Sequence, residues 1–453
     1  MGNPHIIAVP YPAQGHVIPL MEVSLWLVKN GIKVTFVNSD FNHQRIVKSL
    51  SKEDNIKELV NMVSIPDGLE PWEDRNELGQ LTQGIFNVMP QELEALIHKI
   101  NQTEDEIVCV IADWGMGWAF EVAEKLGLRS AAFWSGPAAV LASSFTIPKL
   151  VNDGIIDSDG RPLKNHMVEL SPNIPLMNSK NFLWTCIGDP TTQKIIFDVL
   201  VKCNHTVKLT SWLVCNSSND LEPGAFSLFP NILPIGPLLA RNRLGTSTGY
   251  FWPEESECLT WLDQQLPNSV IYVAFGSFTV FDQTQFEELA LGLELTNRPF
   301  LWVVRQDVTA EIDKVYPKGF NERVHNRGQI VGWAPQQKVL SHPSVACFIS
   351  HCGWNSTIEG IGNGVPFLCW PYFADQFLNQ AYICDEWVVG LGFDKDESGI
   401  IRRGEIEDKV EKLLTGKSYK TRALKLQEKI TDNVTGGSSY DNFNNFIEWI
   451  KDY

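Results

Sequence analysis

The sequence predicts an α/β protein with two domains, each built on a doubly wound parallel sheet. Two observations lead to this prediction. Continuous apolar runs, typical of buried parallel strands, alternate with helical segments, and this pattern starts twice along the chain. The length agrees, because 453 residues exceed one ordinary core at roughly 150 residues per domain. In such folds ligands bind at the carboxyl ends of the strands, so we expect a site in the cleft where two sheets face each other.

The first half opens with a βαβ pattern. An apolar strand, His5 to Pro10, is followed by a loop containing Gly and Pro, a helix from about Pro19, and a second strand at 33–37. Further apolar runs at 107–112 and 131–134 have the continuous hydrophobicity of buried parallel strands. These elements predict one α/β domain.

The pattern restarts after a stretch punctuated by Pro and Gly. Strands are predicted at 269–275 and 300–304, and Asp282 is a suitable N-cap for the helix between them. We therefore expect the following domain organisation: an N-terminal domain at 1–238, a linker at 239–254, a second domain at 255–435, and a terminal helix at 436–453 that packs back on the first domain.

Composition and charge exclude several classes. The formal net charge of −17 opposes nonspecific binding to nucleic acid or to an anionic membrane. Nine widely spaced cysteines without a CxxC pair indicate neither a zinc site nor a disulfide framework. The uncharged segment 130–148 contains Gly136 and Pro137, which argues against a membrane span. We expect a cytoplasmic monomer that binds small molecules.

The segment after the apolar run 346–350 predicts an anion site. Asn355 and Ser356 are good cap residues, Gly353 permits close approach of the backbone, and a helix start offers unpaired N–H groups. A capped helix without any ligand explains this segment equally well.

Two flanking segments offer groups for other parts of a ligand. Trp333, held next to a proline, is a possible platform for a planar base, although burial in a core is the commoner fate of a tryptophan. Asp375 and Gln376 can accept hydrogen bonds from sugar hydroxyls and donate to them.

Together, the 44 residues from Trp333 to Gln376 closely resemble the signature of the plant UDP-sugar-dependent glycosyltransferases that modify small secondary metabolites. The motifs PYPAQGHVIPL near the start, WLDQQLPNSVIYVAFGS at 261–277 and GGSS near the end extend the resemblance over the whole chain. The resemblance implies the GT-B fold, with two Rossmann-like domains facing across a cleft.

The resemblance also implies three groups of donor-binding residues, defined by the part of the UDP-sugar that each contacts. The group for uracil and ribose comprises Trp333, Ala334, Gln336 and Glu359. The group for the diphosphate comprises Ser277, His351, Asn355 and Ser356. The group for the transferred sugar comprises Ser135, Trp354, Asp375 and Gln376. A closing Gln is associated with glucose donors in this family, so UDP-glucose is the expected donor.

His16 is the candidate catalytic base. Transfer to a hydroxyl requires removal of the acceptor proton, and histidine is the side chain best suited to this near neutral pH. His16 follows the first strand directly and matches the base of the family, although a loop histidine is by itself more often a solvated surface residue. Asp113 ends a neighbouring strand and is expected to orient the imidazole, or alternatively to cap a helix.

No metal is expected. The pairs Asp157/Asp159 and Asp394/Asp396 match the DxD pattern of metal-dependent glycosyltransferases, but both flank polar loops in which such carboxylates usually form turns. The predicted reaction is inverting, metal-independent transfer of glucose to a small phenolic, flavonoid or terpenoid hydroxyl. A nucleotide-sugar epimerase or hydrolase of the same fold, and a noncatalytic UDP-sugar-binding protein, are the alternatives.

Overall fold

The computed structural model divides the chain into two compact units. Unit 1 comprises residues 1–252, 373–375 and 432–453, and unit 2 comprises residues 253–372 and 376–431. The described residues are 3–50, 56–103, 105–238, 251, 255–305 and 316–453. Apart from Phe251, the predicted linker 239–254 therefore lies outside the described part of the chain.

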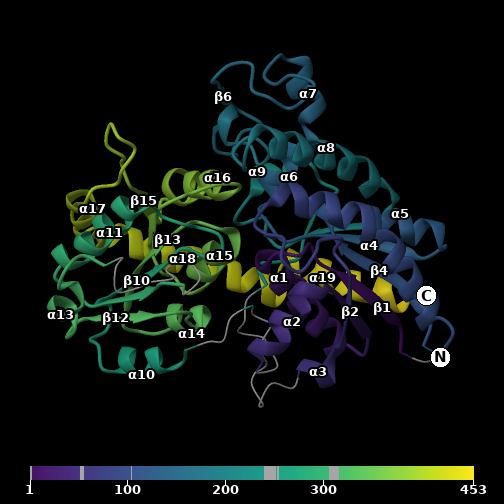
Figure 1. Ribbon diagram of the computed structural model, residues 1–453, viewed down its shortest axis with the longest axis horizontal. Helices are drawn as coiled ribbons and strands as arrows, with labels where there is room; N and C mark the ends of the chain where they lie inside the picture. Colours follow the sequence, from purple (N-terminus) through teal and green to yellow (C-terminus); the bar gives the residue numbers. More distant parts are fainter. Residues whose placement is uncertain (1–2, 51–55, 104, 239–250, 252–254, 306–315) are drawn as a thin grey trace. The chain divides into compact units, whose positions relative to one another are not determined.

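Unit 1 is built on a seven-stranded parallel sheet, seen on the right of Figure 1. Its strand order is β3-β2-β1-β4-β5-β8-β9. The strands are β1 (His5–Val9), β2 (Lys33–Ser39), β3 (Asn61–Ile65), β4 (Ile107–Asp113), β5 (Arg129–Trp134), β8 (Trp212–Cys215) and β9 (Leu233–Pro234). A separate antiparallel hairpin is formed by β6 (Met167–Val168) and β7 (Met177–Asn178).

The helices of unit 1 lie between these strands along the chain, except for the C-terminal helix α19. They are α1 (Gln14–Lys29), α2 (Asp40–Ser49), α3 (Ile56–Leu59), α4 (Leu78–Ile100), α5 (Trp118–Lys125), α6 (Ala138–Phe145), α7 (Ile147–Asn152), α8 (Pro190–Thr206), α9 (Pro223–Leu228) and α19 (Ser438–Lys451). Three short 3₁₀ helices are η1 (Trp114–Met116), η2 (Ser179–Asn181) and η3 (Val207–Leu209).

Both faces of this sheet are covered, which explains the continuous apolar runs in the sequence. Along β1, Ile6 belongs to one core, which includes Phe446 of α19. The next residue, Ile7, belongs to a second core, which includes Ile85 of α4. Successive side chains of a strand point to opposite faces, so a strand buried on both sides must be apolar throughout.

Helix α1 corrects one prediction. It begins at Gln14 and contains Pro19, whereas the proline had indicated a start at about residue 19. Pro19 lies beyond the first turn, where its ring nitrogen cannot donate a hydrogen bond to the i−4 carbonyl, so this proline does not mark the start of the helix. The consequence is that His16 lies in the first turn of a helix rather than in a loop.

Unit 2 is built on a six-stranded parallel sheet of order β12-β11-β10-β13-β14-β15. The strands are β10 (Val270–Ala274), β11 (Phe300–Val303), β12 (Gly328–Val331), β13 (Val345–Ser350), β14 (Phe367–Cys369) and β15 (Gly390–Gly392). The helices are α10 (Glu257–Asp263), α11 (Gln283–Leu295), α13 (Phe320–Val324), α14 (Gln336–Leu340), α15 (Trp354–Gly362), α16 (Gln376–Ala381), η5 (Tyr382–Glu386), α17 (Arg403–Thr415) and α18 (Lys417–Gly436), whose last turn groups with unit 1.

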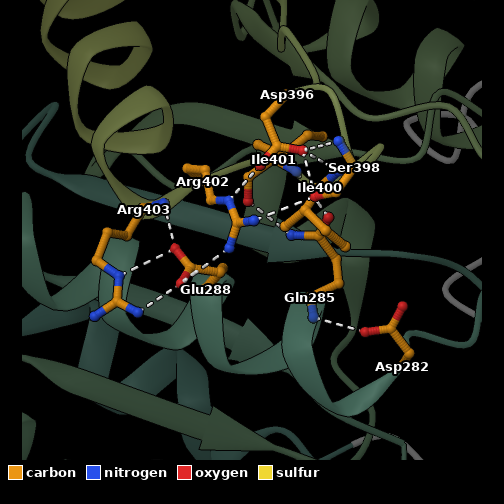
Figure 2. Close-up of polar contacts among 9 residues, drawn as sticks. All are labelled: Asp282, Gln285, Glu288, Asp396, Ser398, Ile400, Ile401, Arg402 and Arg403. Carbon is orange, nitrogen blue, oxygen red and sulfur yellow. Dashed lines mark hydrogen bonds and ion pairs between the residues drawn. The ribbon is translucent and has the colours of Figure 1, made fainter.

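A polar network joins α11 to the start of α17 (Figure 2). Asp282 caps α11 as predicted, accepting a hydrogen bond from the backbone N–H of Gln285 at 2.8 Å. The Gln285 amide forms two hydrogen bonds with the backbone of Ile401, at 2.9 and 3.0 Å. The carboxylate of Glu288 accepts from both the backbone and the guanidinium of Arg403. This network fixes two helices on the same layer of unit 2.

The two units differ from the expected boundaries in two places. The prediction assigned residues 255–435 to the second domain, but residues 373–375 and residues 432–435, at the end of α18, group with unit 1. The Asn433 amide donates to Asp220 at 2.6 Å and its oxygen accepts from the backbone N–H of Ser439 at 2.8 Å. These bonds connect the end of α18 to unit 1.

Candidate functional site

His16 and Asp113 form a hydrogen-bonded pair in unit 1. Asp113 ends β4, is fully buried, and its Oδ2 lies 2.7 Å from Nδ1 of His16. Its other oxygen accepts the backbone N–H of Gly115 at 2.8 Å, so it both orients His16 and caps η1. The two readings of Asp113 left open by the sequence are therefore both realised. With Nδ1–H donated to the carboxylate, Nε2 is the imidazole nitrogen that can take a proton.

The pKa of His16 is raised by its surroundings. Burial lowers it, but the charge of Asp113 and the hydrogen bond to that carboxylate raise it by more, and the charge of Asp375 adds to the rise. A raised pKa makes the imidazole a stronger base, and an ionised carboxylate stabilises the imidazolium that forms.

Ser135 also lies at His16. Its hydroxyl is 3.0 Å from Nδ1 of His16, so the nitrogen is shared between Ser135 and Asp113. The ring of Trp134 stands edge-on to the imidazole at 6.2 Å, and the ring of Tyr11 lies 5.2 Å away on a tilted plane. The sequence assigned Ser135 to the transferred sugar and gave no sign of this contact with the base.

In unit 2, the loop between β13 and α15 differs from the expected capping. The N-cap of α15 is Gly353, with no side chain on a backbone N–H, and the helix begins at Trp354. Asn355 and Ser356 therefore lie within the first turn rather than at the cap. Gly353 has no side chain with which to cap the first turn of α15, and a helix start of this kind can bind an anion.

His351 lies in this loop, close to two glycines. A Cβ atom at Gly276 or at Gly353 would come within 2.5 Å of its Nε2, so only glycine fits at either position. Burial lowers the pKa of His351 to about 4, and the charge of Arg305 lowers it too, against a hydrogen bond with the backbone of Ala274. The imidazole is therefore neutral at pH 7.

Two of the predicted uridine-binding residues, Gln336 and Glu359, belong to one hydrogen-bonded cluster. The side-chain amide of Gln336 donates to Glu359 at 2.7 Å and to Ser356 at 2.9 Å. Its oxygen accepts from the hydroxyl of Tyr272 at 3.2 Å. Gln337 donates to the other oxygen of Glu359 at 2.9 Å. Each oxygen of this carboxylate therefore has a fixed donor, which sets its orientation.

The two predicted tryptophans differ in exposure. Trp333 is half-buried, unlike a tryptophan of a closed core, and precedes the buried Ala334. Trp354 is buried, with its ring 6.4 Å from that of Trp387. Trp333 thus keeps surface available for stacking.

The remaining donor candidates fall in different parts of the chain. Ser277 lies half-buried in the turn after β10, and the oxygen of the buried Gln376 accepts the backbone N–H of Tyr372 at 2.7 Å. Asp375 groups with unit 1, as Ser135 does. Of the twelve predicted donor residues, unit 2 thus contains ten.

Some residues at these sites carry no clear sequence signal. Arg305 is buried and donates to the carbonyl of Gly276 at 3.2 Å, which supports the turn bearing Ser277. Its place directly after a predicted strand could have identified it. Tyr272 lies within a strand and Gln337 next to a known candidate, and neither position by itself indicated a role.

A flat apolar acceptor would pack against exposed aromatic side chains, but three large aromatic residues of unit 1 belong to its core. Trp114, Phe182 and Trp184 are at most 1% exposed, and the last two stack at 4.9 Å. By contrast, Tyr372 is 49% exposed. Burial therefore removes three of these aromatic side chains from the group that can present a free surface to an acceptor.

The carboxylates of the DxD pairs bind their own turns. Asp157 accepts the backbone N–H groups of Asp159 and Arg161, and Asp396 accepts those of Ser398 and Ile400. Among the described residues, no three His, Cys, Asp or Glu side chains are grouped to hold a metal ion. In the same part of the chain, no helix has the length and hydrophobicity to cross a membrane.

Comparisons with known proteins agree with these observations. Residues 228–435 match the family described as UDP-glucoronosyl and UDP-glucosyl transferase. The chain is 46% identical to UDP-glycosyltransferase 83A1 of Arabidopsis thaliana, over 100% of this chain and 97% of that protein.

Two solved structures are similar over nearly their whole length. A UDP-glucosyltransferase from Polygonum tinctorium capable of glucosylating indoxyl, in complex with 3,4-dichloroaniline, has a TM-score of 0.83 at 27% identity and covers 100% of this chain and 99% of that one. Phytolacca americana UGT2, complexed with UDP-2fluoro-glucose and pterostilbene, has a TM-score of 0.81 at 28% identity, with 99% of each chain covered. With two Rossmann-like units of the GT-B type, the chain belongs to the family of plant UDP-glycosyltransferases.

Proposed function

We propose that this UDP-glycosyltransferase transfers glucose from UDP-glucose to a hydroxyl of a small phenolic, flavonoid or terpenoid acceptor, with inversion at the anomeric carbon and without a metal ion. The observation that carries the proposal is the 2.7 Å contact between His16 and the buried Asp113. It fixes the imidazole in the tautomer that a general base requires.

The proposed reaction is a single displacement. Nε2 of His16 takes the proton of the acceptor hydroxyl as its oxygen forms a bond to the anomeric carbon. The bond from that carbon to the UDP oxygen breaks, and UDP leaves with the electron pair. Attack from the side opposite the leaving group converts an α-linked donor into a β-glucoside. Asp113 stabilises the imidazolium without accepting its proton.

The leaving diphosphate requires stabilisation of its negative charge. In the proposal, the N-terminal turn of α15 and the hydroxyl of Ser277 supply dipoles. His351, kept neutral by its lowered pKa, adds a hydrogen-bond donor rather than a charge. These local groups are needed because the formal net charge of the chain, −17, does not attract an anionic diphosphate.

Metal independence is supported by the occupation of the acidic pairs. In the 394–396 pair, Asp396 already accepts bonds from its own turn and from the guanidinium of Arg402. A carboxylate committed in this way is a poor ligand for a metal-bound nucleotide.

The proposed donor and acceptor classes draw on the donor motif and on the relatives. Gln376 closes the motif, and the Polygonum tinctorium enzyme is described as glucosylating indoxyl. The structure of Phytolacca americana UGT2 contains UDP-2fluoro-glucose and pterostilbene. We also propose that the chain acts as a monomer, since it supplies both the candidate base and the donor-binding residues. We propose a cytoplasmic location because its nine cysteines are free, which suits a reducing compartment.

The test is a transfer assay with a panel of UDP-sugars and hydroxylated acceptors, with and without EDTA. We expect acceptor-dependent product from UDP-glucose at an unchanged rate in EDTA, and a β-linkage by NMR. Free glucose without acceptor-dependent product would contradict the choice of a hydroxyl acceptor from these classes. An α-linkage would contradict inversion, and loss of activity in EDTA would contradict metal independence.

A further inference from the structure

The segment that carries Ser135 is held from several sides. It runs from the end of β5 to the start of α6, and Trp134 Nε1 donates across it to the carbonyl of Pro137 at 2.8 Å. The backbone N–H of Asn216 donates to the carbonyl of Trp134 at 2.9 Å. Ser135 is 3% exposed, so its hydroxyl is directed by packing rather than by solvent. The position of this hydroxyl at His16 therefore depends on how the segment is anchored.

Helix α6 lacks a cap of its own. Its N-cap residue is Pro137, which has no side-chain hydrogen bond to the helix. The orphan N–H groups of the first turn are instead satisfied by Glu222, from a distant part of the chain. Glu222 Oε2 accepts the N–H of Ala138 at 2.7 Å, and Oε1 accepts that of Ala139 at 2.9 Å.

Glu222 is a costly residue at this position. Its side chain is fully buried, and the hydroxyl of Ser217 donates to Oε2 at 2.6 Å. No arginine or lysine pairs with this carboxylate among its described contacts. Burial raises the pKa of Glu222 to about 7 against its three hydrogen bonds, and the charge of Asp375 raises it further. Burying a carboxylate destabilises the fold unless its oxygens accept hydrogen bonds. Here both oxygens accept hydrogen bonds from the first turn of α6.

We propose that Glu222 is a positioning residue for the transfer reaction, which holds the segment 135–139 so that the hydroxyl of Ser135 meets Nδ1 of His16. The described hydrogen bonds of Glu222 go to Ala138, Ala139 and Ser217 and not to His16. It acts through the backbone of Ala138 and Ala139, two residues that directly follow the turn at Pro137. This inference rests on the proposed role of His16 as the base.

The main variant is Glu222→Gln, which keeps the volume of the side chain. Its amide nitrogen would face a backbone N–H, so one of the two helix contacts is lost and α6 shifts at its start. We expect kcat to fall about tenfold, as misplacement of a catalytic assembly does, with KM for UDP-glucose unchanged. The His16 titration, followed by NMR of the imidazole, should shift, because the hydroxyl at Nδ1 moves. Besides Ser135, the groups that face His16 are Asp113, Asp375 and Tyr11.

The double variant Ser135→Ala/Glu222→Gln separates this role from general loss of structure. If Glu222 acts through Ser135, adding Glu222→Gln to Ser135→Ala lowers kcat by less than about twofold. If the fold-reduction of kcat in the double variant equals the product of the fold-reductions in the two single variants, the proposal is overturned. The NMR titration separates this proposal from the proposed function. If the pKa of His16 shifts in Glu222→Gln while His16→Ala keeps full activity, then Glu222 positions the Ser135 hydroxyl but His16 is not the catalytic base.

Asp189→Asn is the matched control. Asp189 also accepts two backbone N–H groups at a helix start in unit 1, those of Thr191 and Thr192 at the start of α8. We expect wild-type kcat and a wild-type His16 titration. If Glu222→Gln does not fold, Ser217→Ala removes only the hydroxyl from Oε2 and should still lower kcat about threefold. A Ser217→Ala variant with wild-type kcat and titration, or a Glu222→Gln variant that loses only stability, would overturn the proposal.

Discussion

At the scale of single residues, two histidines are set in opposite states by their surroundings. His16 has the buried carboxylate of Asp113 at 2.7 Å, and its pKa is raised. His351 has no such partner, and burial lowers its pKa to about 4. The carboxylate of Asp113 raises the pKa of His16, which suits its proposed role as a base, whereas burial keeps His351 a neutral polar group.

Replacing Asp113 with Asn should change the pH profile of the reaction. Catalysis needs unprotonated His16, so the rate falls as the pH drops through the pKa of this residue. Removal of the carboxylate charge lowers that pKa, and the acidic limb of kcat/KM moves to lower pH. The maximal kcat should drop at least about a hundredfold, since the tautomer is no longer fixed.

The control for this profile is Asp105→Asn, an exposed carboxylate of the same unit that pairs with Lys33. It should leave both limbs of the profile in place. An acidic limb unmoved in Asp113→Asn would show that Asp113 does not set the pKa of His16.

The lowered pKa of His351 predicts a dependence of stability on pH. Between pH 6.5 and about 4 the unfolded chain binds a proton at this residue and the folded chain does not, so the free energy of unfolding decreases as the pH falls through this window. The contribution lost by pH 4 is about 3 kcal/mol. Urea unfolding at several pH values should show a steeper loss in the native chain than in His351→Asn. Equal slopes would mean that His351 is protonated in the fold.

At the scale of elements, helix starts determine where the chemistry lies. His16 is in the first turn of α1, the loop after β13 leads into α15, and the side chain of Glu222, a residue distant in sequence, caps α6. None of these three helices has a side-chain cap from its own N-cap residue. In a doubly wound sheet, helix starts follow the carboxyl ends of strands, and their N–H groups are available to a distant carboxylate or to an anionic ligand.

The contact between α11 and α17 should contribute to the stability of unit 2. Glu288 is buried and accepts three hydrogen bonds from Arg403 (Figure 2). Glu288→Ala should lower the free energy of unfolding by about 2 kcal/mol, because it leaves these donors without an acceptor. Chemical denaturation measures the loss. The control is Glu287→Ala. The side chain of Glu287 accepts a hydrogen bond only from Gln283 of the same helix among its described contacts, so the free energy of unfolding should change by under about 0.5 kcal/mol.

At the scale of the whole molecule, the sequence predicted the two α/β halves because several central strands are continuous apolar runs and each half repeats the same alternation of strand and helix. It also placed Asp282 correctly as a cap, since capping is a local signal. The starts of α1 and α15 were predicted less well, because Pro19, Asn355 and Ser356 have several permitted places near a helix start.

Contacts between distant residues were beyond the reach of sequence patterns. Ser135 meets His16 across 119 positions, and Glu222 meets Ala138 across 84. Both contacts depend on the strand order β1-β4-β5-β8, which brings the ends of these strands to one edge of the sheet. Neither residue type indicates such a partner, because a serine in a loop and a glutamate before a proline are ordinary on a surface.

The most direct test of the account is the turnover of His16→Ala together with its affinity for UDP. We expect kcat with a hydroxyl acceptor to fall by about 10²–10⁴, the contribution of a general base, while the Kd for UDP is unchanged. His98→Ala, an exposed histidine on α4, should match the native chain in both. A His16→Ala enzyme that turns over at a near-native rate would contradict the account.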